Sequence, residues 1–449
     1  MTNDMTSGNP ARLILGFMIP TCLGNIFQQV YNLADSIIAG QFIGVDALAA
    51  IGSTSSLIFF VIGWLNGLTS GFSSLAAQRF GARQYDQMRH YVAMSIYLCL
   101  AFVIVMTAGL ELLNYPLLRL INTPENILQD TGSYMAIIYA GLTVTAAYNA
   151  LAAVLRALGD SKSPLYFLII SACINVFLDI IFILNFHMGV AGCAYATVIS
   201  QGISALLCLI YIVKKFDILK LSRKDFRVDY PCMGQLLAIG IPMGLQFSIT
   251  AIGTIIVQGA VNAFGSVYIA GFAAAGKIQN IVTTVFVAFG ATIATYVGQN
   301  RGAGRMDRVH QGVRITQIMI LVWSFVIMAI VYLFGGYLIR IFVSSSETQV
   351  IEAATVYFHA VAWCYPFLGS IFLYRNALQG LGFGLVPMLG GIFELVARFA
   401  VVQIIVGLGV GFAGICLADP AAWIAALIPI VPYYFHKIKR ITKTSVLSS

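Results

Sequence analysis

Two acidic side chains, Asp35 and Asp179, interrupt long apolar runs that offer them no obvious basic partner. Asn175 precedes Asp179 by one helical turn, so its amide shares a helix face with that carboxylate. Thr197 adds a hydroxyl group from the next apolar run. Together these groups form the oxygen-rich environment that a proton or a small hard cation needs. The alternative interpretation is that both aspartates are hydrogen-bonded packing residues.

Most of the chain is apolar, with 59% hydrophobic and only 9% charged residues. A water-soluble core cannot hide that much apolar surface, so we expect a membrane protein. A helix needs about 20 residues to cross the hydrocarbon layer. Twelve runs have that length, at 13–38, 47–72, 92–113, 131–155, 164–186, 189–213, 235–264, 268–298, 315–339, 351–374, 387–408 and 411–436. The predicted fold class is an all-α membrane protein with twelve transmembrane helices.

Three motifs of the first half recur in the second half, shifted by 221 to 223 positions. Ile19-Pro20 recurs as Ile241-Pro242, and Leu158-Gly159 recurs as Leu381-Gly382. The longest motif, Gln78-Arg79-Phe80-Gly81-Ala82-Arg83, recurs as Gln299-Asn300-Arg301-Gly302-Ala303-Gly304. The shared register predicts a duplicated unit of about 220 residues, a feature typical of membrane transporters. We expect two homologous six-helix lobes, 1–213 and 235–449, joined by a cytoplasmic linker over 214–234.

The acids of the first lobe are predicted to lie at one depth. Asp35 precedes the outer end of its helix by about five residues, Asp179 precedes the outer end of its own by about eight, and Thr197 follows the start of the next helix by about eight. All three groups should therefore lie in the outer half of the membrane.

The second lobe holds four further charged residues within its apolar runs. Glu394 and Arg398 are four residues apart with the acid first, so they pair on one helix face, and the simplest interpretation is a neutralised intrahelical pair. Asp419 precedes a proline at a predicted helix break. Lys277 is either its partner or a snorkelling side chain. These four residues form a possible second polar site.

The basic residues predict the orientation of the chain. Of 25 lysines and arginines, 21 fall on one side if both termini lie there, with Arg375 counted among them. The positive-inside rule makes that side the cytoplasm. We expect a multi-pass protein of the cell (inner) membrane with both termini cytoplasmic. The formal charge of +8 is then a topogenic signal, and nucleic-acid binding is not needed to explain it.

Several motifs of enzymes are absent from the sequence. It has no phosphate-binding Gly-x-x-x-x-Gly-Lys-Ser/Thr loop, no His-Glu-x-x-His pair and no Gly-x-Ser-x-Gly elbow. The sequence therefore offers no group of metal ligands or nucleophiles that a membrane-embedded enzyme would need. We expect no enzymatic activity, cofactor or metal. A channel would not need two duplicated lobes.

The order and spacing of the motifs resemble the multidrug and toxic compound extrusion (MATE) transporters over roughly residues 10–440. The resemblance rests on the twelve helices, Gln28-x-x-Tyr31-Asn32-x-x-Asp35-x-x-x-x-Gly40, the repeated Gln-Arg-Phe-Gly-Ala and Gln-Asn-Arg-Gly-Ala segments, Leu155-Arg156-Ala157-Leu158-Gly159-Asp160 and Asn175-x-x-x-Asp179. It implies alternating access and export of amphipathic, often cationic compounds in exchange for protons or sodium ions. It also implies a first-lobe cation site formed by Asp35, Asn175, Asp179 and Thr197.

One departure concerns the second lobe. A branch of the family has an acid early in the seventh helix, where this chain has the amides Gln246 and Gln258. A second-lobe cation site is therefore not expected from the resemblance.

The predicted function is secondary antiport of amphipathic drugs or toxins by a monomer in the lipid bilayer. Moving a positive charge outward costs about 2.3 kcal/mol per 100 mV, so a cationic substrate needs a driving ion. We expect H+ first and Na+ second. Tyr31, Tyr139, Gln246 and Phe286 are candidates for a substrate cavity, although aromatic residues in spans more often pack.

The alternative function is a flippase for lipid-linked oligosaccharides or peptidoglycan precursors, from the same superfamily. A pyrophosphate substrate favours a cationic cavity. The embedded acids Asp35, Asp179, Glu394 and Asp419 instead outnumber the embedded bases Lys277 and Arg398.

Overall fold

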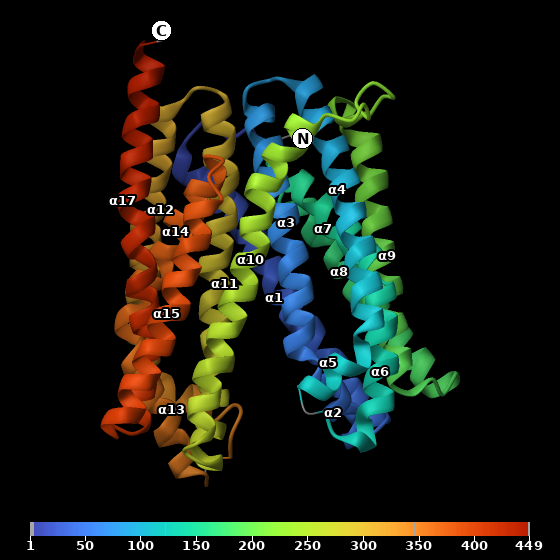
Figure 1. Ribbon diagram of the computed structural model, residues 1–449, viewed down its shortest axis with the longest axis vertical. Helices are drawn as coiled ribbons and strands as arrows, with labels where there is room; N and C mark the ends of the chain where they lie inside the picture. The colour runs from blue at the N-terminus through green and yellow to red at the C-terminus, as the bar shows by residue number, and fades with distance from the viewer. Residues whose placement is uncertain (1–3, 122, 345, 448–449) are drawn as a thin grey trace. The chain divides into compact units, whose positions relative to one another are not determined.

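The computed structural model describes residues 4–121, 123–344 and 346–447. Within these residues the chain forms helices joined by short turns, without a strand (Figure 1). Eleven of the described helices are long and apolar enough to cross a membrane, and the bent pair Glu125–Ala140 and Leu142–Ala157 supplies a twelfth. Each predicted apolar run corresponds to one of these spans, so the prediction of an all-α membrane protein is confirmed.

The first half holds nine α-helices, a π-helical turn and a 3₁₀ turn among the described residues. These are α1 (Pro10–Phe42), α2 (Val45–Ser53), α3 (Ser55–Gly81), α4 (Tyr85–Leu112), α5 (Asn114–Leu120), α6 (Glu125–Ala140), α7 (Leu142–Ala157), α8 (Lys162–Ile180), η1 (Ile181–Asn185), α9 (Gly189–Lys215) and η2 (Asp217–Leu219).

The second half holds eight α-helices and one 3₁₀ turn in the part that the structure describes. These are α10 (Tyr230–Asn262), α11 (Ser266–Gly302), α12 (Met306–Ile339), α13 (Thr348–Val361), η3 (Ala362–Cys364), α14 (Tyr365–Gly380), α15 (Leu385–Leu408), α16 (Phe412–Ile415) and α17 (Ala418–Leu447).

The chain divides into two compact units. Unit 1 comprises Met1–Asp4 and Ile19–Gly244, and unit 2 comprises Met5–Met18 and Leu245–Ser449. The division falls inside α1 and α10, next to Pro20 and Pro242, the prolines within these two helices. The boundaries predicted from the repeat describe sequence halves rather than compact units, and they stay a prediction.

Two of the breaks within predicted spans have a local cause in the structure. The run at 47–72 covers the junction of α2 and α3, where Ser53 and Thr54 donate side-chain hydrogen bonds to the carbonyl oxygens of Ala50 and Ile51, at 2.9 and 2.7 Å. Such bonds compete with the helical pattern. The run at 131–155 bends by 47° between α6 and α7. A Cβ atom at Gly141 there would lie 2.9 Å from Val198 Cγ1, so glycine allows this close approach.

The second repeated motif, at 78–83 and 299–304, forms in both halves a helix end followed by a tight turn. In both, the first four residues complete a helix, α3 or α11. The sixth residue has a positive φ in each, 57° at Arg83 and 70° at Gly304. A backbone hydrogen bond closes each turn, from Gln84 N to Arg79 O at 3.0 Å and from Arg305 N to Asn300 O at 2.8 Å. The sequence repeat is therefore also a repeat of local backbone conformation.

Gly304→Ala is expected to destabilise the protein by about 1 kcal/mol, because a Cβ atom disfavours the left-handed region. No atom lies within 4 Å of that Cβ position, so the cost arises from the backbone alone. Gly234→Ala is the matched control, since Gly234 has equally open surroundings but lies within α10, where alanine favours the helix by up to about 1 kcal/mol. Denaturant unfolding in detergent micelles should give opposite signs, and equal signs would contradict this argument.

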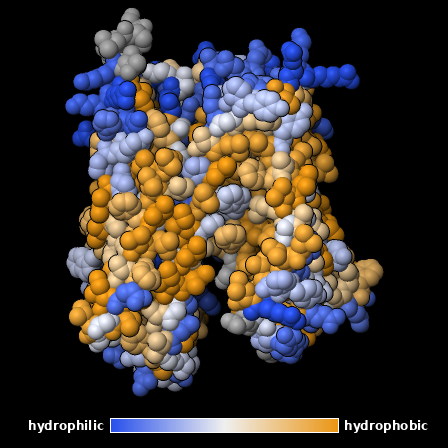
Figure 2. Space-filling view, in the orientation of Figure 1, coloured by the Kyte–Doolittle hydropathy of each residue, from blue (hydrophilic) through white to orange (hydrophobic). Residues whose placement is uncertain are grey.

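Apolar side chains cover the middle of the helices, with hydrophilic side chains at the helix ends (Figure 2). Exposed examples are Ile104, Val105 and Ile428, each more than 60% exposed. In a bilayer such side chains contact lipid, and every backbone polar group is satisfied within the helix. The charged residues that are buried inside this apolar layer therefore mark the places to examine for function.

Candidate cation site and its surroundings

Unit 1 brings Asp35, Asp179 and Thr197 together from three helices. The carboxyl group of Asp35 on α1 lies beside the carboxyl group of Asp179 on α8 and the hydroxyl group of Thr197 on α9. At about 1.5 Å per residue, these residues lie roughly 9 to 12 Å from the ends of their helical segments at Phe42, Asn185 and Gly189. These similar distances agree with the meeting of the three side chains, and their depth in a membrane stays a prediction.

The polar atoms of this group lack hydrogen-bond partners. Asp179 and Asn175 are fully buried, whereas Asp35 and Thr197 are half-buried. The side-chain atoms without a partner at hydrogen-bonding distance and angle, among the described residues, are Asp35 Oδ1, both carboxylate oxygens of Asp179, both amide atoms of Asn175 and Thr197 Oγ1. The groups are neighbours, but they do not satisfy one another. Buried polar atoms left in this way are costly, so their persistence points to a bound partner.

Two tyrosines and one cysteine complete the surroundings. Tyr31, one turn before Asp35 on α1, faces Asp35, Asp179 and Thr197. Tyr134 on α6 and Cys193 on α9 also face both carboxylates. The sequence pattern does not indicate Tyr134, and it suggests Tyr31 only for a substrate cavity. A phenol in an apolar run carries no charge signal, so only the packing of α6 against α9 identifies Tyr134.

The segment after Asp179 departs from the α-helical pattern. α8 ends at Ile180, and the five residues Ile181–Asn185 form a π-helical turn. Single π-helical turns occur frequently at functional sites. This turn places an irregular backbone two residues beyond the buried carboxylate.

In the part of the chain that the structure describes, no basic side chain interacts with either aspartate. The same residues contain no group of three or more His, Cys, Asp or Glu side chains suited to a metal ion. The site thus offers two carboxylates and neutral oxygen atoms. A monovalent cation or a proton is the ligand that such a set can hold.

The charged residues of unit 2 form a different arrangement, a connected network. Arg398 Nε donates to Asp419 Oδ1 at 3.0 Å, and Arg398 Nη1 lies 3.6 Å from Glu394 Oε2. Arg375 Nη1 lies 3.8 Å from Glu394 Oε1, and the Tyr357 hydroxyl group donates to Asp419 Oδ2 at 3.1 Å. The network links α13, α14, α15 and α17. Its two acids and two bases compensate one another.

Two sequence interpretations need correction here. Arg375 was assigned to a cytoplasmic segment because its apolar run ends at 374, but it lies within α14 and faces Glu394. Lys277 is not the partner of Asp419, because that acid pairs with Arg398. Lys277 is exposed, and its ammonium group lies 5.3 Å from the centroid of the Phe342 ring. Lys277 is therefore the snorkelling side chain of the two alternatives.

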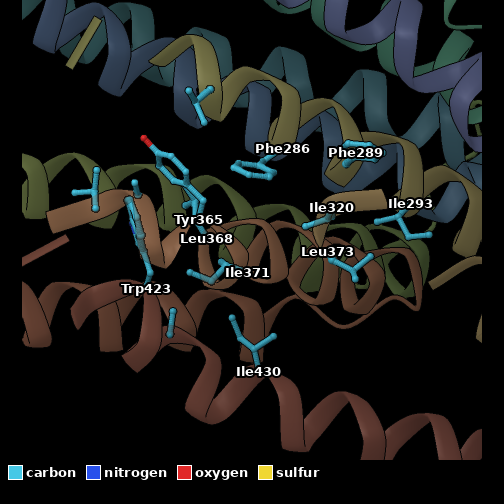
Figure 3. Packing of buried hydrophobic residues seen from close by; sticks show 14 of the residues in the cluster. Phe286, Phe289, Ile293, Ile320, Tyr365, Leu368, Ile371, Leu373, Trp423 and Ile430 are labelled. Carbon is cyan, nitrogen blue, oxygen red and sulfur yellow. The ribbon is translucent and has the colours of Figure 1, made fainter. Parts of the chain in front are cut away.

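The other cavity candidates lie within packed regions. Tyr139 and Phe286 are fully buried. In Figure 3 the Phe286 ring lies among the apolar core residues of unit 2, a cluster that also includes Tyr365. Gln246 is buried and accepts a hydrogen bond from Gln379 at 3.4 Å. Tyr139 and Phe286 are therefore packed inside the protein. That these residues and Gln246 line a substrate cavity stays a prediction.

Comparisons with known proteins agree with this architecture. Residues 20–181 and 242–408 match the family model described as MatE. The probable multidrug resistance protein YpnP of Bacillus subtilis (strain 168) is 31% identical over 84% of this chain and 84% of its own length. The probable multidrug resistance protein YoeA of the same organism is 28% identical over 95% of this chain and 94% of its own.

A solved structure described as "Crystal structure of MATE in complex with MaL6" has the same fold. Its TM-score is 0.91 at 22% sequence identity, and the match covers 99% of this chain and 100% of that one. The family match covers more than half of the chain, and YpnP exceeds 30% identity over most of it. The chain therefore belongs to the multidrug and toxic compound extrusion (MATE) family of efflux transporters.

Proposed function

We propose that this transporter exports amphipathic, cationic compounds in exchange for H+, with Na+ as the second choice, by alternating access. Asp35 and Asp179 bind the coupling ion, and Asn175 and Thr197 are neutral ligands. The observation that carries the proposal is the group of buried, unsatisfied oxygen atoms around two carboxylates without a basic partner among the described residues.

The energetics favour a titratable or cation-filled site. Keeping one charged side chain in the membrane costs at least about 2.5 kcal/mol, so two adjacent carboxylates need compensation. A proton or Na+ bound between them supplies it. Two acids this close titrate as a coupled pair, so one proton stays while the other exchanges. An ion that binds one access state better than the other then drives the conversion between states.

Unit 2 supports placing the coupling site in unit 1. Its buried acids already have arginine partners, so no net negative charge remains there to attract a cation. The same pairing argues against the flippase alternative, because both arginines of this network are engaged with Glu394 rather than available for a pyrophosphate. Export of drugs is supported by the two relatives named for multidrug resistance.

Uptake of a fluorescent organic cation by proteoliposomes tests the proposal. An imposed pH gradient, acidic inside the proteoliposomes so that H+ leaves as the organic cation enters, should accelerate uptake at least tenfold over liposomes without protein. A sodium gradient should do so only if Na+ is the coupling ion. Equal uptake with and without either gradient would contradict antiport.

We further propose that both termini and the turns after α3 and α11 lie in the cytoplasm, in the cell membrane. The support is the concentration of basic residues there, including Arg79, Arg83, Arg301 and Arg305. Single cysteines placed at Ala82 and Ala303 should resist an impermeant thiol reagent added to intact cells and react after permeabilisation. Reaction at either position in intact cells would overturn this orientation.

A further inference from the structure

The segment between α9 and α10 is fixed on unit 1 by its apolar side chains. Phe216 and Leu219 are buried in the apolar cluster that also contains Phe80 and Leu155. Phe226 packs edge-on against Tyr97 of α4, with 5.9 Å between ring centroids. The segment is therefore an ordered surface of unit 1.

The acids of this segment are engaged within the protein. Asp225 accepts hydrogen bonds from the amide and hydroxyl groups of Ser222, at 2.7 and 2.8 Å, and lies 3.6 Å from Arg89 Nε. Burial alone would raise the pKa of Asp225, but the Ser222 hydrogen bonds and the charges of Arg89 and His90 outweigh it and hold the pKa below its usual value. Asp225 therefore stays ionised while it faces α4.

The remaining acids are also paired. His90 Nε2 lies 3.2 Å from Asp229 Oδ2, and His90 Nδ1 lies 2.9 Å from the carbonyl oxygen of Asp225. Asp217 pairs with Lys220 at 2.5 Å. Little negative charge is left to balance the basic side chains of the segment.

The basic side chains all face outward. The exposed ones are Lys214, Lys215, Lys220, Arg223, Lys224 and Arg227. Except for Lys220, these have no recorded carboxylate partner among the described residues. Figure 2 shows strongly hydrophilic side chains over the upper ends of α4 and α9 as drawn in Figure 1. Two exposed apolar residues, Val228 and Tyr230, follow directly at the start of α10.

We propose that this basic surface, residues 214–227, binds the phosphate head groups of anionic phospholipids in the cytoplasmic leaflet. Basic clusters immediately next to a transmembrane helix are suited to anionic lipid surfaces. Val228 and Tyr230 lie at the membrane boundary, where tyrosine is favoured. Because the segment is already ordered and Asp225 faces α4, its basic groups lose little freedom when lipid binds.

Native mass spectrometry of the purified full-length protein tests this surface. The protein is taken from nanodiscs of equal parts phosphatidylglycerol and phosphatidylcholine, and retained lipid is counted. Arg223→Gln, Lys224→Gln and Arg227→Gln combined should lower phosphatidylglycerol retention at least tenfold, since each basic residue contributes about fivefold. Phosphatidylcholine retention should not change. Inorganic phosphate should not displace the lipid.

Two further variants test whether the loss of lipid is specific to this surface. They also test whether it comes from the lost charge rather than from misfolding. Neutralising Arg119 and Arg340, two exposed basic residues outside this surface, to glutamine is the control and should leave retention nearly unchanged. The charge-preserving triple Arg223→Lys, Lys224→Arg and Arg227→Lys should retain lipid like the original chain. An equal loss in the Arg119 and Arg340 control, an unchanged first triple, or displacement by phosphate would overturn the proposal. The readout does not depend on transport, so it is separate from the proposed function.

Discussion

Replacing either Asp35 or Asp179 with asparagine is expected to reduce gradient-driven efflux at least a hundredfold while the protein still folds. Asparagine fills the same space but cannot release a proton or neutralise a cation, so the driving ion no longer distinguishes the access states. Because the two carboxyl groups interact, neither alone should sustain coupling. Initial rates of dye export from proteoliposomes under a pH gradient measure the effect.

Three comparisons make this prediction specific. Asn175→Ala should weaken export less, because it removes a neutral ligand and no charge. Asp130→Asn is the control, since Asp130 is an exposed acid on α6 in the same unit. Its rate should equal that of the original chain. Well-folded aspartate variants that export at the original rate would show that the site lies elsewhere.

Arg398→Met is expected to destabilise the protein by about 3 to 5 kcal/mol, because it leaves the Asp419 carboxylate without a charge partner. Arg398 contacts both Asp419 and Glu394, and its side chain is about 5% exposed. The hydrophobic replacement fills the space but cannot balance these charges. Denaturant unfolding in detergent micelles measures the loss of free energy.

A second substitution should recover much of this loss. With Asp419→Asn added, the remaining buried charges are Glu394 and Arg375, which form a neutral pair. The asparagine oxygen still accepts the hydrogen bond of Tyr357. Lys277→Met is the control and should cost about 1 kcal/mol or less, since that exposed ammonium group contacts only the Phe342 ring in the described structure. A double variant no more stable than Arg398→Met would contradict the charge argument.

The sequence grouped three residues of the candidate site because helical rise converts position along a helix into distance from the helix end. Asp35, Asp179 and Thr197 lie on separate helices, yet counting residues from the helix ends placed them at one level. Tyr134 could not be found in this way, because a neutral phenol in an apolar run resembles any packing residue. The π-helical turn after Asp179 also has no signal in the apolar pattern of its residues.

The sequence was less informative about unit 2, for two physical reasons. Helices continue past the apolar runs, so Arg375, one residue beyond its run, was placed outside the membrane although α14 extends to Gly380. Partners on different helices cannot be inferred from spacing, so Arg398 was paired with Glu394 but not with Asp419, 21 positions away. Only the four-residue spacing within one helix allowed a pairing to be predicted.

The most direct test of the account is ion movement driven by substrate. Proteoliposomes without any imposed gradient receive an organic cation on one side, while a pH-sensitive dye and a sodium-sensitive dye report the other compartment. The account predicts that substrate flow moves H+ or Na+ in the opposite direction, and that Asp35→Asn and Asp179→Asn abolish this counterflow. Substrate flow without ion movement, or ion movement that persists in both variants, would contradict it.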